Sequence, residues 1–243
     1  MLKMDQVSKS FGDKHVLEQI SVDIHPGEFI SIIGPSGSGK STIFNLIGGL
    51  LTPDQGDIYM NDQLITGTTG QISYMPQQSA LFPWRTVLHN VLLGQELQGK
   101  KETNRAIDML EKAGLGDVIH AYPHELSGGM KQRAAFIRAL LSPQTFMCLD
   151  EPFSALDDFT RFDMQKWLLE TWEAYERSIL FITHNIDEAL FLSDKIIILS
   201  TNPAKIKHIM TVPFARPRDQ ELLLSADFIK QKKELIKMMH TYG

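Results

Sequence analysis

Three short runs of consecutive apolar residues divide the chain, and each is typical of a strand that is buried on both faces. They are EFISIIG (28–34), QTFMCLDEP (144–152) and SILFITH (178–184). Apolar residues at helical spacing occupy residues 40–50, directly after the first run, and residues 161–176, between the second and the third. This alternation of strands and helices predicts an α/β fold with a parallel sheet.

Two other regions have different patterns. Residues 15–24 alternate between apolar and polar positions and end at a His-Pro-Gly turn signal, so residues 1–25 are predicted to form short strands. Residues 52–65 indicate a turn and another short pair of strands. From about residue 80 to residue 141 the pattern becomes helical, which predicts a helical subdomain inserted into the sheet. The tail, residues 225–240, is predicted to be an amphipathic helix.

Composition narrows the class of protein. The chain has 243 residues, with 24 basic and 29 acidic side chains and a net charge of −5, so it lacks the basic excess of a nucleic-acid binder. Its apolar runs are far shorter than the roughly 18 residues that a membrane span requires. The single cysteine, Cys148, excludes an internal disulfide, and its apolar surroundings favour a small buried side chain over a nucleophile.

A glycine-rich segment joins the first buried strand to the following helix. It reads GPSGSGKST and matches the pattern G-x-x-x-x-G-K-[ST] where a phosphate-binding loop, or P-loop, is expected. The glycines let backbone N–H groups surround a phosphate, Lys40 reaches phosphate oxygens, and the Ser41 hydroxyl is a ligand for Mg²⁺. The predicted nucleotide-binding residues are Gly34, Pro35, Ser36, Gly37, Ser38, Gly39, Lys40, Ser41 and Thr42.

Two carboxylates end the second buried run. A P-loop enzyme needs a further carboxylate near Mg²⁺, usually from a parallel strand beside the strand of the P-loop. Asp150 is predicted to hold the metal, directly or through water. The side chain of Glu151 should leave the strand end in another direction, where it is predicted to activate a water as general base.

A second glycine pair raises a separate question. Residues 124–141 read HELSGGMKQRAAFIRALL, in which Ser127, Gly128 and Gly129 precede a helix pattern. A helix start offers unpaired N–H groups and partial positive charge, and glycines let an anion approach closely. The chain therefore has a second candidate phosphate site that is distant in sequence from the P-loop.

Four residues remain open on sequence chemistry alone. His184 follows the third buried run, at the strand end where ligands bind in parallel sheets, so it is either a phosphate contact or a structural residue. Phe11 is either a core aromatic or a surface on which a base stacks. Phe82 and Trp84 flank Pro83 among loop residues, which fits core packing as well as partner docking.

Taken together, these residues resemble one family, the ATP-binding subunits of ABC transporters. LSGGMKQR (126–133) is similar to its signature motif, and the combination with an upstream P-loop and a downstream LDEP is specific to that family. The resemblance covers essentially the whole chain. It implies a single ABC ATPase domain over residues 1–243, with a P-loop NTPase core of mainly parallel sheet and an N-terminal antiparallel β subdomain in 1–79 and 142–243. The inserted α-helical subdomain is residues 80–141.

The resemblance also assigns roles near one nucleotide. Phe11 matches the aromatic residue that stacks on adenine. Gln77 matches the glutamine that touches Mg²⁺ and links the nucleotide to the membrane partner, and His184 matches the switch histidine. With Glu151, these two form the implied catalytic group, and Ser41, Gln77 and Asp150 form the implied metal site.

Other roles concern partner chains. Ser127, Gly128 and Gly129 match residues that contact the γ-phosphate of ATP held by the opposite subunit, and Asp157 matches the loop that crosses the dimer interface. Many members carry Gln where this chain has Met130, which leaves no amide at that position. Phe82 and Trp84 are predicted to dock on the permease.

The implied function is an ATPase that powers a membrane importer, with ATP and Mg²⁺ as cofactors. The expected partners are transmembrane permease subunits, a second copy of the chain and, indirectly, an extracytoplasmic solute-binding protein, at the cytoplasmic face of the membrane. The segments LFPWRTVLHNVLLG and FARPRD resemble importers of nitrate, sulfonates, taurine and thiamin pyrimidine precursors. The alternatives are a soluble ABC ATPase outside transport and a scaffold that only binds nucleotide.

Overall fold

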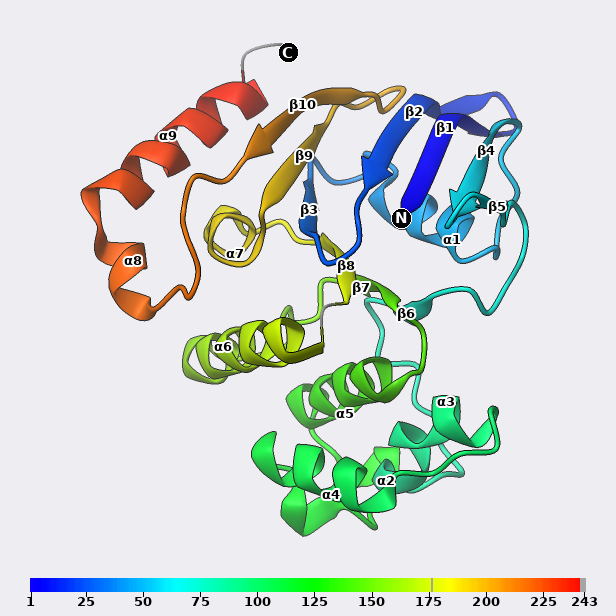
Figure 1. The fold of residues 1–243 in the computed structure, drawn as a ribbon, viewed down its shortest axis with the longest axis vertical. Coiled ribbons are helices and arrows are strands. Elements are labelled where there is room, and N and C mark those ends of the chain that lie inside the picture. The colour runs from blue at the N-terminus through cyan, green and yellow to red at the C-terminus, as the bar shows by residue number, and fades with distance from the viewer. Residues whose placement is uncertain (176, 241–243) are drawn as a thin grey trace.

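Two β-sheets form the upper part of the protein in the computed structural model, which describes residues 1–175 and 177–240 (Figure 1). The larger sheet is parallel except for its edge strand β10, which runs antiparallel to β9. In spatial order its strands are β10 (Ile206–Thr211), β9 (Lys195–Leu199), β3 (Phe29–Ile33), β8 (Ser178–Ile182), β7 (Phe146–Asp150) and β6 (Ser73–Met75). The predicted parallel α/β sheet is thus confirmed.

The strand order corrects one expectation. The strand that ends at Asp150, β7, is not beside the P-loop strand β3, because β8 lies between them. Asp150 still reaches the P-loop, since the carboxyl ends of β3, β8 and β7 meet at one edge of the sheet. The sequence patterns also assigned no strand to β6, β9 or β10.

The smaller sheet is antiparallel throughout. Its order is β2 (Lys14–Ile24), β1 (Leu2–Phe11), β4 (Gln55–Met60) and β5 (Gln63–Leu64). It confirms the short strands predicted for residues 1–25 and the strand pair predicted within residues 52–65.

Helices surround these sheets and also form a separate group below them. Four of them lie between β6 and β7 in sequence: α2 (Val87–Val91), α3 (Leu93–Glu96), α4 (Thr103–Lys112) and α5 (Gly128–Leu141), with 3-10 turns at Gly116–Val118 and Pro123–Glu125. The others are α1 (Lys40–Ile47), α6 (Asp158–Tyr175), α7 (Ile186–Leu192), α8 (Gln220–Leu224) and α9 (Ala226–His240).

Two helix predictions differ from the structure at their ends. Helix α1 stops at Ile47 rather than at residue 50, because Gly48 and Gly49 follow and Gly49 has φ 70°. The predicted helix over residues 161–176 begins earlier, at Asp158, and its last residue lies outside the described residues. The predicted amphipathic tail helix is confirmed as α9.

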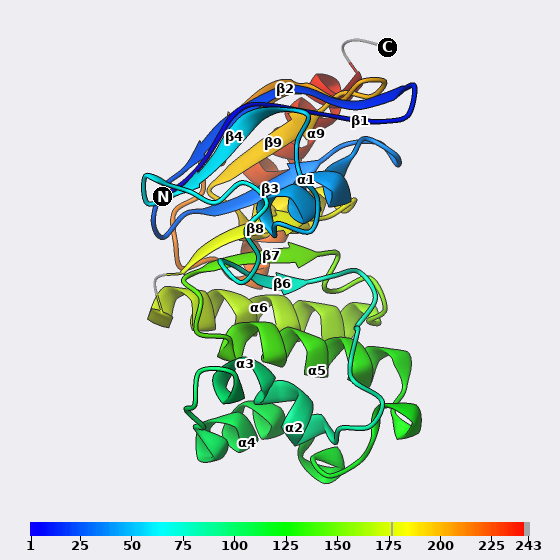
Figure 2. The same cartoon turned by 90° about the vertical axis from the view of Figure 1, so that its right-hand side faces the viewer.

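Alternate residues of the central strands pack into two cores. In β3, Phe29 and Ile33 belong to the core beneath α5 and α6, whereas Ile30 and Ile32 belong to the core shared with α1 and the antiparallel sheet. Figure 2 shows this layering, with the antiparallel sheet and α1 on one side of the larger sheet and α6 and α5 on the other. Cys148 is fully buried in the second core, as expected. No helix within the described residues is long and apolar enough to cross a bilayer.

Candidate functional site

A cleft of about 460 Å³ opens where β3 and β7 end. Residues from five segments far apart in the sequence line it. They are Phe11, Lys14, Val16, Ser36, Gly37, Ser38, Gly39, Lys40, Ser41, Thr42, Gln77, Asp150, Glu151 and Ile182. The cleft therefore brings together the P-loop, the predicted metal ligands, the predicted general base and Phe11, all within one chain.

The P-loop takes its shape from backbone angles that favour glycine. Gly37 and Gly39 have φ of 78° and 76°, in the left-handed region. Gly39 immediately precedes α1, and a Cβ atom on Gly39 would lie 2.7 Å from Leu17 Cδ2. Lys40 Nζ folds back over the loop and donates to the carbonyls of Gly34 and Pro35, both at 2.9 Å. The ammonium group is therefore held at the centre of the loop.

Two charges of opposite sign meet at the floor of the cleft. Burial lowers the pKa of Lys40, an effect that the carboxylates of Glu151 and Asp150 oppose. Burial raises the pKa of Asp150, and a hydrogen bond from the Ser41 hydroxyl counteracts that shift. A hydroxyl and a carboxylate that already touch are a suitable pair of oxygen ligands for a small hard cation.

Glu151 is the centre of a hydrogen-bonded group at the rim of the floor. Gln77 Nε2 donates to its Oε2 at 3.0 Å, and His184 Nδ1 lies 3.2 Å from its Oε1. Its backbone N–H donates to the carbonyl of Ile182 in β8 at 3.0 Å, and its φ is 48°. The structure thus places the three predicted catalytic side chains in contact, and the imidazole of His184 is mostly exposed.

Phe11 lies at the end of β1 on the opposite wall of the cleft. Its ring is 48% exposed, which excludes the core alternative for this residue. Lys9 Nζ lies 5.7 Å from the ring centroid. An exposed ring beside a phosphate loop is positioned to stack on a planar group.

The second glycine pair lies outside this cleft. Ser127 caps α5 by accepting a hydrogen bond from the N–H of Met130 at 3.2 Å, so the helix starts where the sequence predicts. A Cβ on Gly128 would meet nothing within 4 Å, whereas one on Gly129 would lie 3.3 Å from Leu156. Ser127, Gly128 and Gly129 do not line the cleft, so any phosphate that they bind enters from outside this chain's own P-loop site.

Asp157 has a local structural role in the single chain. Its carboxylate accepts the N–H of Thr160 at 3.0 Å in the first turn of α6. Hydrogen bonds from Thr160 lower its pKa. The side chain of Asp157 is exposed. Ala155, two residues before it, has its carbonyl oxygen next to Gly129.

Phe82 and Trp84 form a stacked pair near the start of the helical segment. Their ring centroids are 5.1 Å apart, and Trp84 is 70% exposed. This exposure excludes core packing for Trp84. The buried amide of Asn90 holds the backbone beneath them, because Nδ2 donates to the carbonyls of Phe82, Arg85 and Thr86 and Oδ1 accepts the N–H of Phe82.

Three residues to which the motifs assigned no role connect the cleft, the aromatic pair and α5. Asn90 fixes the aromatic pair. Arg138 of α5 donates to the carbonyls of Ala80 and Ser79. These hydrogen bonds tie the segment after Gln77 to α5. Gln132, also in α5, bonds the residues around Glu151. The sequence carries no signal for these contacts. Those of Gln132 and Arg138 join residues that lie far apart in the chain, and Asn90 is hidden on the buried face of a helix.

Comparisons with known proteins agree with this geometry. A protein-family model described as ABC transporter matches residues 17–154. The chain is 43% identical over 207 residues to the formylaminopyrimidine import ATP-binding protein ThiZ of Halalkalibacterium halodurans, covering 84% of this chain and 81% of that protein. It is 38% identical over 246 residues to the aliphatic sulfonates import ATP-binding protein SsuB of Bacillus cereus, covering 100% and 96%.

A solved structure has the same fold. It is the dimeric, post-hydrolysis state of the ATP-binding cassette MJ0796 bound to ADP and Pi, with a TM-score of 0.77 and 30% identity. The match covers 88% of this chain and 100% of that one.

Proposed function

The chain belongs to the ATP-binding proteins of ABC transporters, and from this premise we propose that two copies of it power a membrane importer of small solutes. As a member of this family it binds and hydrolyses ATP. One observation carries the proposal of two copies. The chain has a complete P-loop cleft and, outside the lining of that cleft, a second glycine-rich helix start at Ser127, Gly128 and Gly129.

Within the cleft the residues divide the work. The ATP phosphates replace the carbonyls of Gly34 and Pro35 as acceptors for Lys40, and P-loop N–H groups surround them. Adenine stacks on Phe11. Glu151 polarises the attacking water, and His184 contacts the γ-phosphate beside it.

The cleft also fits Mg²⁺. Ser41 and Asp150 supply a hydroxyl and a carboxylate, and Gln77 adds an amide oxygen, since its Nε2 donates to Glu151. The cation would neutralise charge that develops on the phosphates.

The second copy completes each site. Ser127, Gly128 and Gly129 of one chain approach the γ-phosphate held by the other chain's P-loop, and Asp157 lies at the contact between the chains. The solved MJ0796 cassette, whose structure is dimeric, supports this arrangement. Closure around ATP moves the permease, and hydrolysis allows reopening.

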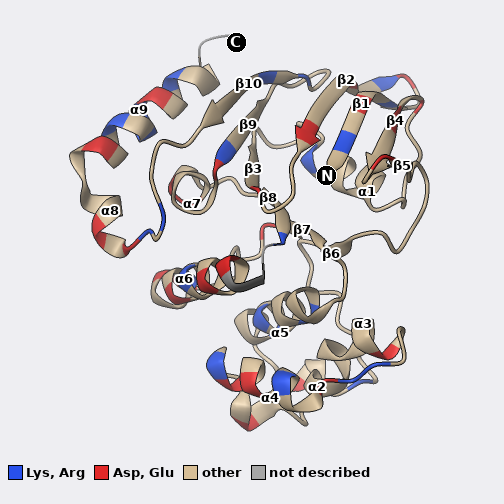
Figure 3. Ribbon diagram, in the orientation of Figure 1, with Lys and Arg blue, Asp and Glu red and all other residues tan. Residues whose placement is uncertain are grey.

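The importer assignment concerns partners. Trp84, which is exposed and stacks on the half-buried Phe82, presents an aromatic surface to transmembrane permease subunits. These subunits place the chain at the cytoplasmic face of the membrane. Acidic and basic residues are interspersed along α4 and α9 (Figure 3), which favours protein partners over nucleic acid. The names of ThiZ and SsuB support a formylaminopyrimidine or an aliphatic sulfonate as the solute. An extracytoplasmic binding protein delivers it in this proposal, and nitrate and taurine stay predictions.

Mixing two inactive variants tests the composite site. Lys40→Ala removes the P-loop cation, and Ser127→Arg blocks the signature side. Each variant alone should lose ATPase activity. A dimer with one chain of each kind keeps one intact site, so an equal mixture should recover measurable activity, at most about a quarter of the wild-type level.

The matched control is the double variant Lys40→Ala/Ser127→Arg mixed with wild-type chain. Its mixed dimers have no intact site, so they should add nothing to the activity of the remaining wild-type dimers. If the two single variants do not complement each other, the signature residues act within one chain and the two-copy proposal is wrong. A soluble ATPase outside transport would pass this test but fail to co-purify with a permease.

A further inference from the structure

Gln132 is a buried polar residue that the nucleotide site does not include. It belongs to α5, four residues after Gly128, and only 3% of it is exposed. Its Nε2 donates to the carbonyl of Glu151 at 3.0 Å and to Ser154 Oγ at 3.1 Å. Its Oε1 accepts the N–H of Ala155 at 2.7 Å. The side-chain amide is thus bonded through both its donor and its acceptor to residues 151–155.

The backbone that Gln132 holds is in a strained conformation. Glu151 has φ 48°, in the left-handed region that a non-glycine residue occupies only when its surroundings impose it. Three contacts impose it here besides the bond of its N–H to Ile182: Gln132 Nε2, Ser154 Oγ and the Ser154 N–H all donate to the Glu151 carbonyl. This peptide orientation aims the Glu151 carboxylate at Gln77 and His184.

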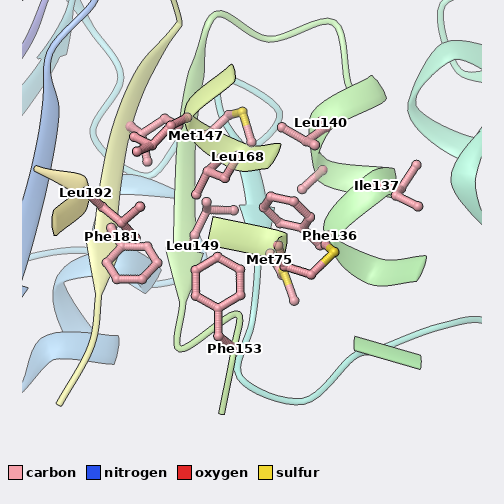
Figure 4. Packing of buried hydrophobic residues seen from close by; sticks show 14 of the residues in the cluster. Met75, Phe136, Ile137, Leu140, Met147, Leu149, Phe153, Leu168, Phe181 and Leu192 are labelled. Atoms are coloured by element: carbon pink, nitrogen blue, oxygen red, sulfur yellow. The ribbon is translucent and has the colours of Figure 1, made fainter. Parts of the chain in front are cut away.

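The helix that carries Gln132 is itself firmly packed. Figure 4 shows Phe136, Ile137 and Leu140 of α5 in the same apolar cluster as Leu149 of β7 and Phe153. The ring centroids of Phe136 and Phe153 are 6.0 Å apart. A shift of α5 therefore reaches residues 151–155 through both apolar contacts and the Gln132 amide.

We propose that Gln132 is a positioning residue that couples the signature end of α5 to Glu151 and to the loop that begins at Ser154. The inference rests on the proposed function, in which Ser127 and its neighbours sense the partner's ATP and Glu151 activates water. A phosphate bound at the start of α5 thereby sets the peptide that orients the general base of the same chain. Each ATP in the dimer then influences hydrolysis of the other.

Replacing Gln132 tests this role. Gln132→Met keeps the side-chain length but removes all three hydrogen bonds. Because a misplaced catalytic group costs turnover without costing nucleotide contacts, kcat should fall by about 10- to 100-fold while the KM for ATP stays within about twofold. The steady-state ATPase assay and the thermal midpoint are measured on the full chain.

Gln95→Met is the matched control. Gln95 is another buried glutamine, in α3, where its amide accepts the N–H of Glu102 and donates to the carbonyl of Leu141. A similar loss of thermal stability with unchanged kcat is expected. An equal loss of kcat in this control would overturn the proposal, because the effect would then be general destabilisation.

Two further variants keep the result decisive. Ser154→Ala removes the other side-chain hydrogen bond to the Glu151 carbonyl and leaves the one from the Ser154 N–H. Residue 154 is exposed, so the variant is testable even where Gln132→Met fails to fold. It should lower kcat by about three- to tenfold with KM unchanged. Wild-type kcat in a folded Gln132→Met, or in Ser154→Ala if Gln132→Met does not fold, overturns the proposal. Wild-type kcat in Glu151→Gln would instead contradict the proposed function.

Discussion

Two helices of this protein begin with glycine-rich segments, and they use glycine for different reasons. Before α1, Gly39 has φ 76° and its missing Cβ leaves room for Leu17 and Val16. At the start of α5, Gly128 has ordinary helical backbone and open space around it. The P-loop glycines thus shape a loop inside the chain, whereas Gly128 leaves an approach path for something outside it.

Capping differs in the same way. Gly39 offers no side-chain cap to α1, and Lys40 covers the loop from within. Ser127 caps α5 through its own hydroxyl. The P-loop is therefore assembled with the carboxylates of Asp150 and Glu151 close to Lys40, whereas the start of α5 has open space beside Gly128. In the proposed dimer, the first region carries out the chemistry and the second responds to the partner's ATP.

The largest expected effect follows from replacing Glu151, the proposed general base. Glu151→Gln keeps the size of the side chain but cannot take a proton, so kcat should fall by about 10²- to 10⁴-fold. ATP binding, measured by equilibrium titration, should persist, and the variant should form ATP-dependent dimers in size-exclusion chromatography. Hydrolysis at the wild-type rate would show that Glu151 is not the general base, and the proposed division between the P-loop region and the start of α5 would be wrong.

A pair of alanine substitutions compares the two glycine roles directly. Gly39→Ala forces a left-handed alanine and a clash with Leu17, which should destabilise the fold by about 1–2 kcal/mol and weaken ATP binding. Gly128→Ala should leave stability equal or higher by less than about 1 kcal/mol, because alanine favours helices. It should leave ATP binding intact yet slow hydrolysis about tenfold, since the methyl group obstructs the phosphate.

Thermal unfolding and ATP titration on both variants test these expected changes in stability and ATP binding. If Gly128→Ala binds and hydrolyses ATP as the wild type does, the open space at α5 has no ligand. If Gly39→Ala is as stable as the wild type, the P-loop shape does not depend on a left-handed residue.

Features formed by residues close together in the sequence were predictable, whereas those formed by distant residues were not. The P-loop was predictable because strand, loop and helix are contiguous, and the cap at Ser127 because it is formed within three residues. The neighbours of β7 in the sheet were not predictable, because parallel strands pair across long connections. The sequence therefore did not indicate that β8 lies between β3 and β7. Likewise, Gln132 looked like one more polar residue of a helix, although its amide reaches a carbonyl 19 residues away.

The smallest expected effect concerns the helical segment's outer surface. Trp84 is 70% exposed and contacts Phe82, so Trp84→Ala should change stability by no more than about 0.5 kcal/mol. The ATPase activity of the isolated chain should also be unchanged, because this pair lies outside the cleft. Leu64→Ala, at an exposed position of β5, is the control.

The measurement is co-purification with the transmembrane permease subunits. Trp84→Ala should lose the permease while Leu64→Ala retains it, because a large exposed ring contributes much of the energy where it becomes buried at an interface. Equal retention by both would show that the permease binds another face. The helical segment would then serve the partner's ATP through α5 alone, and its exposed aromatic pair would have no part in the distinction between the two regions.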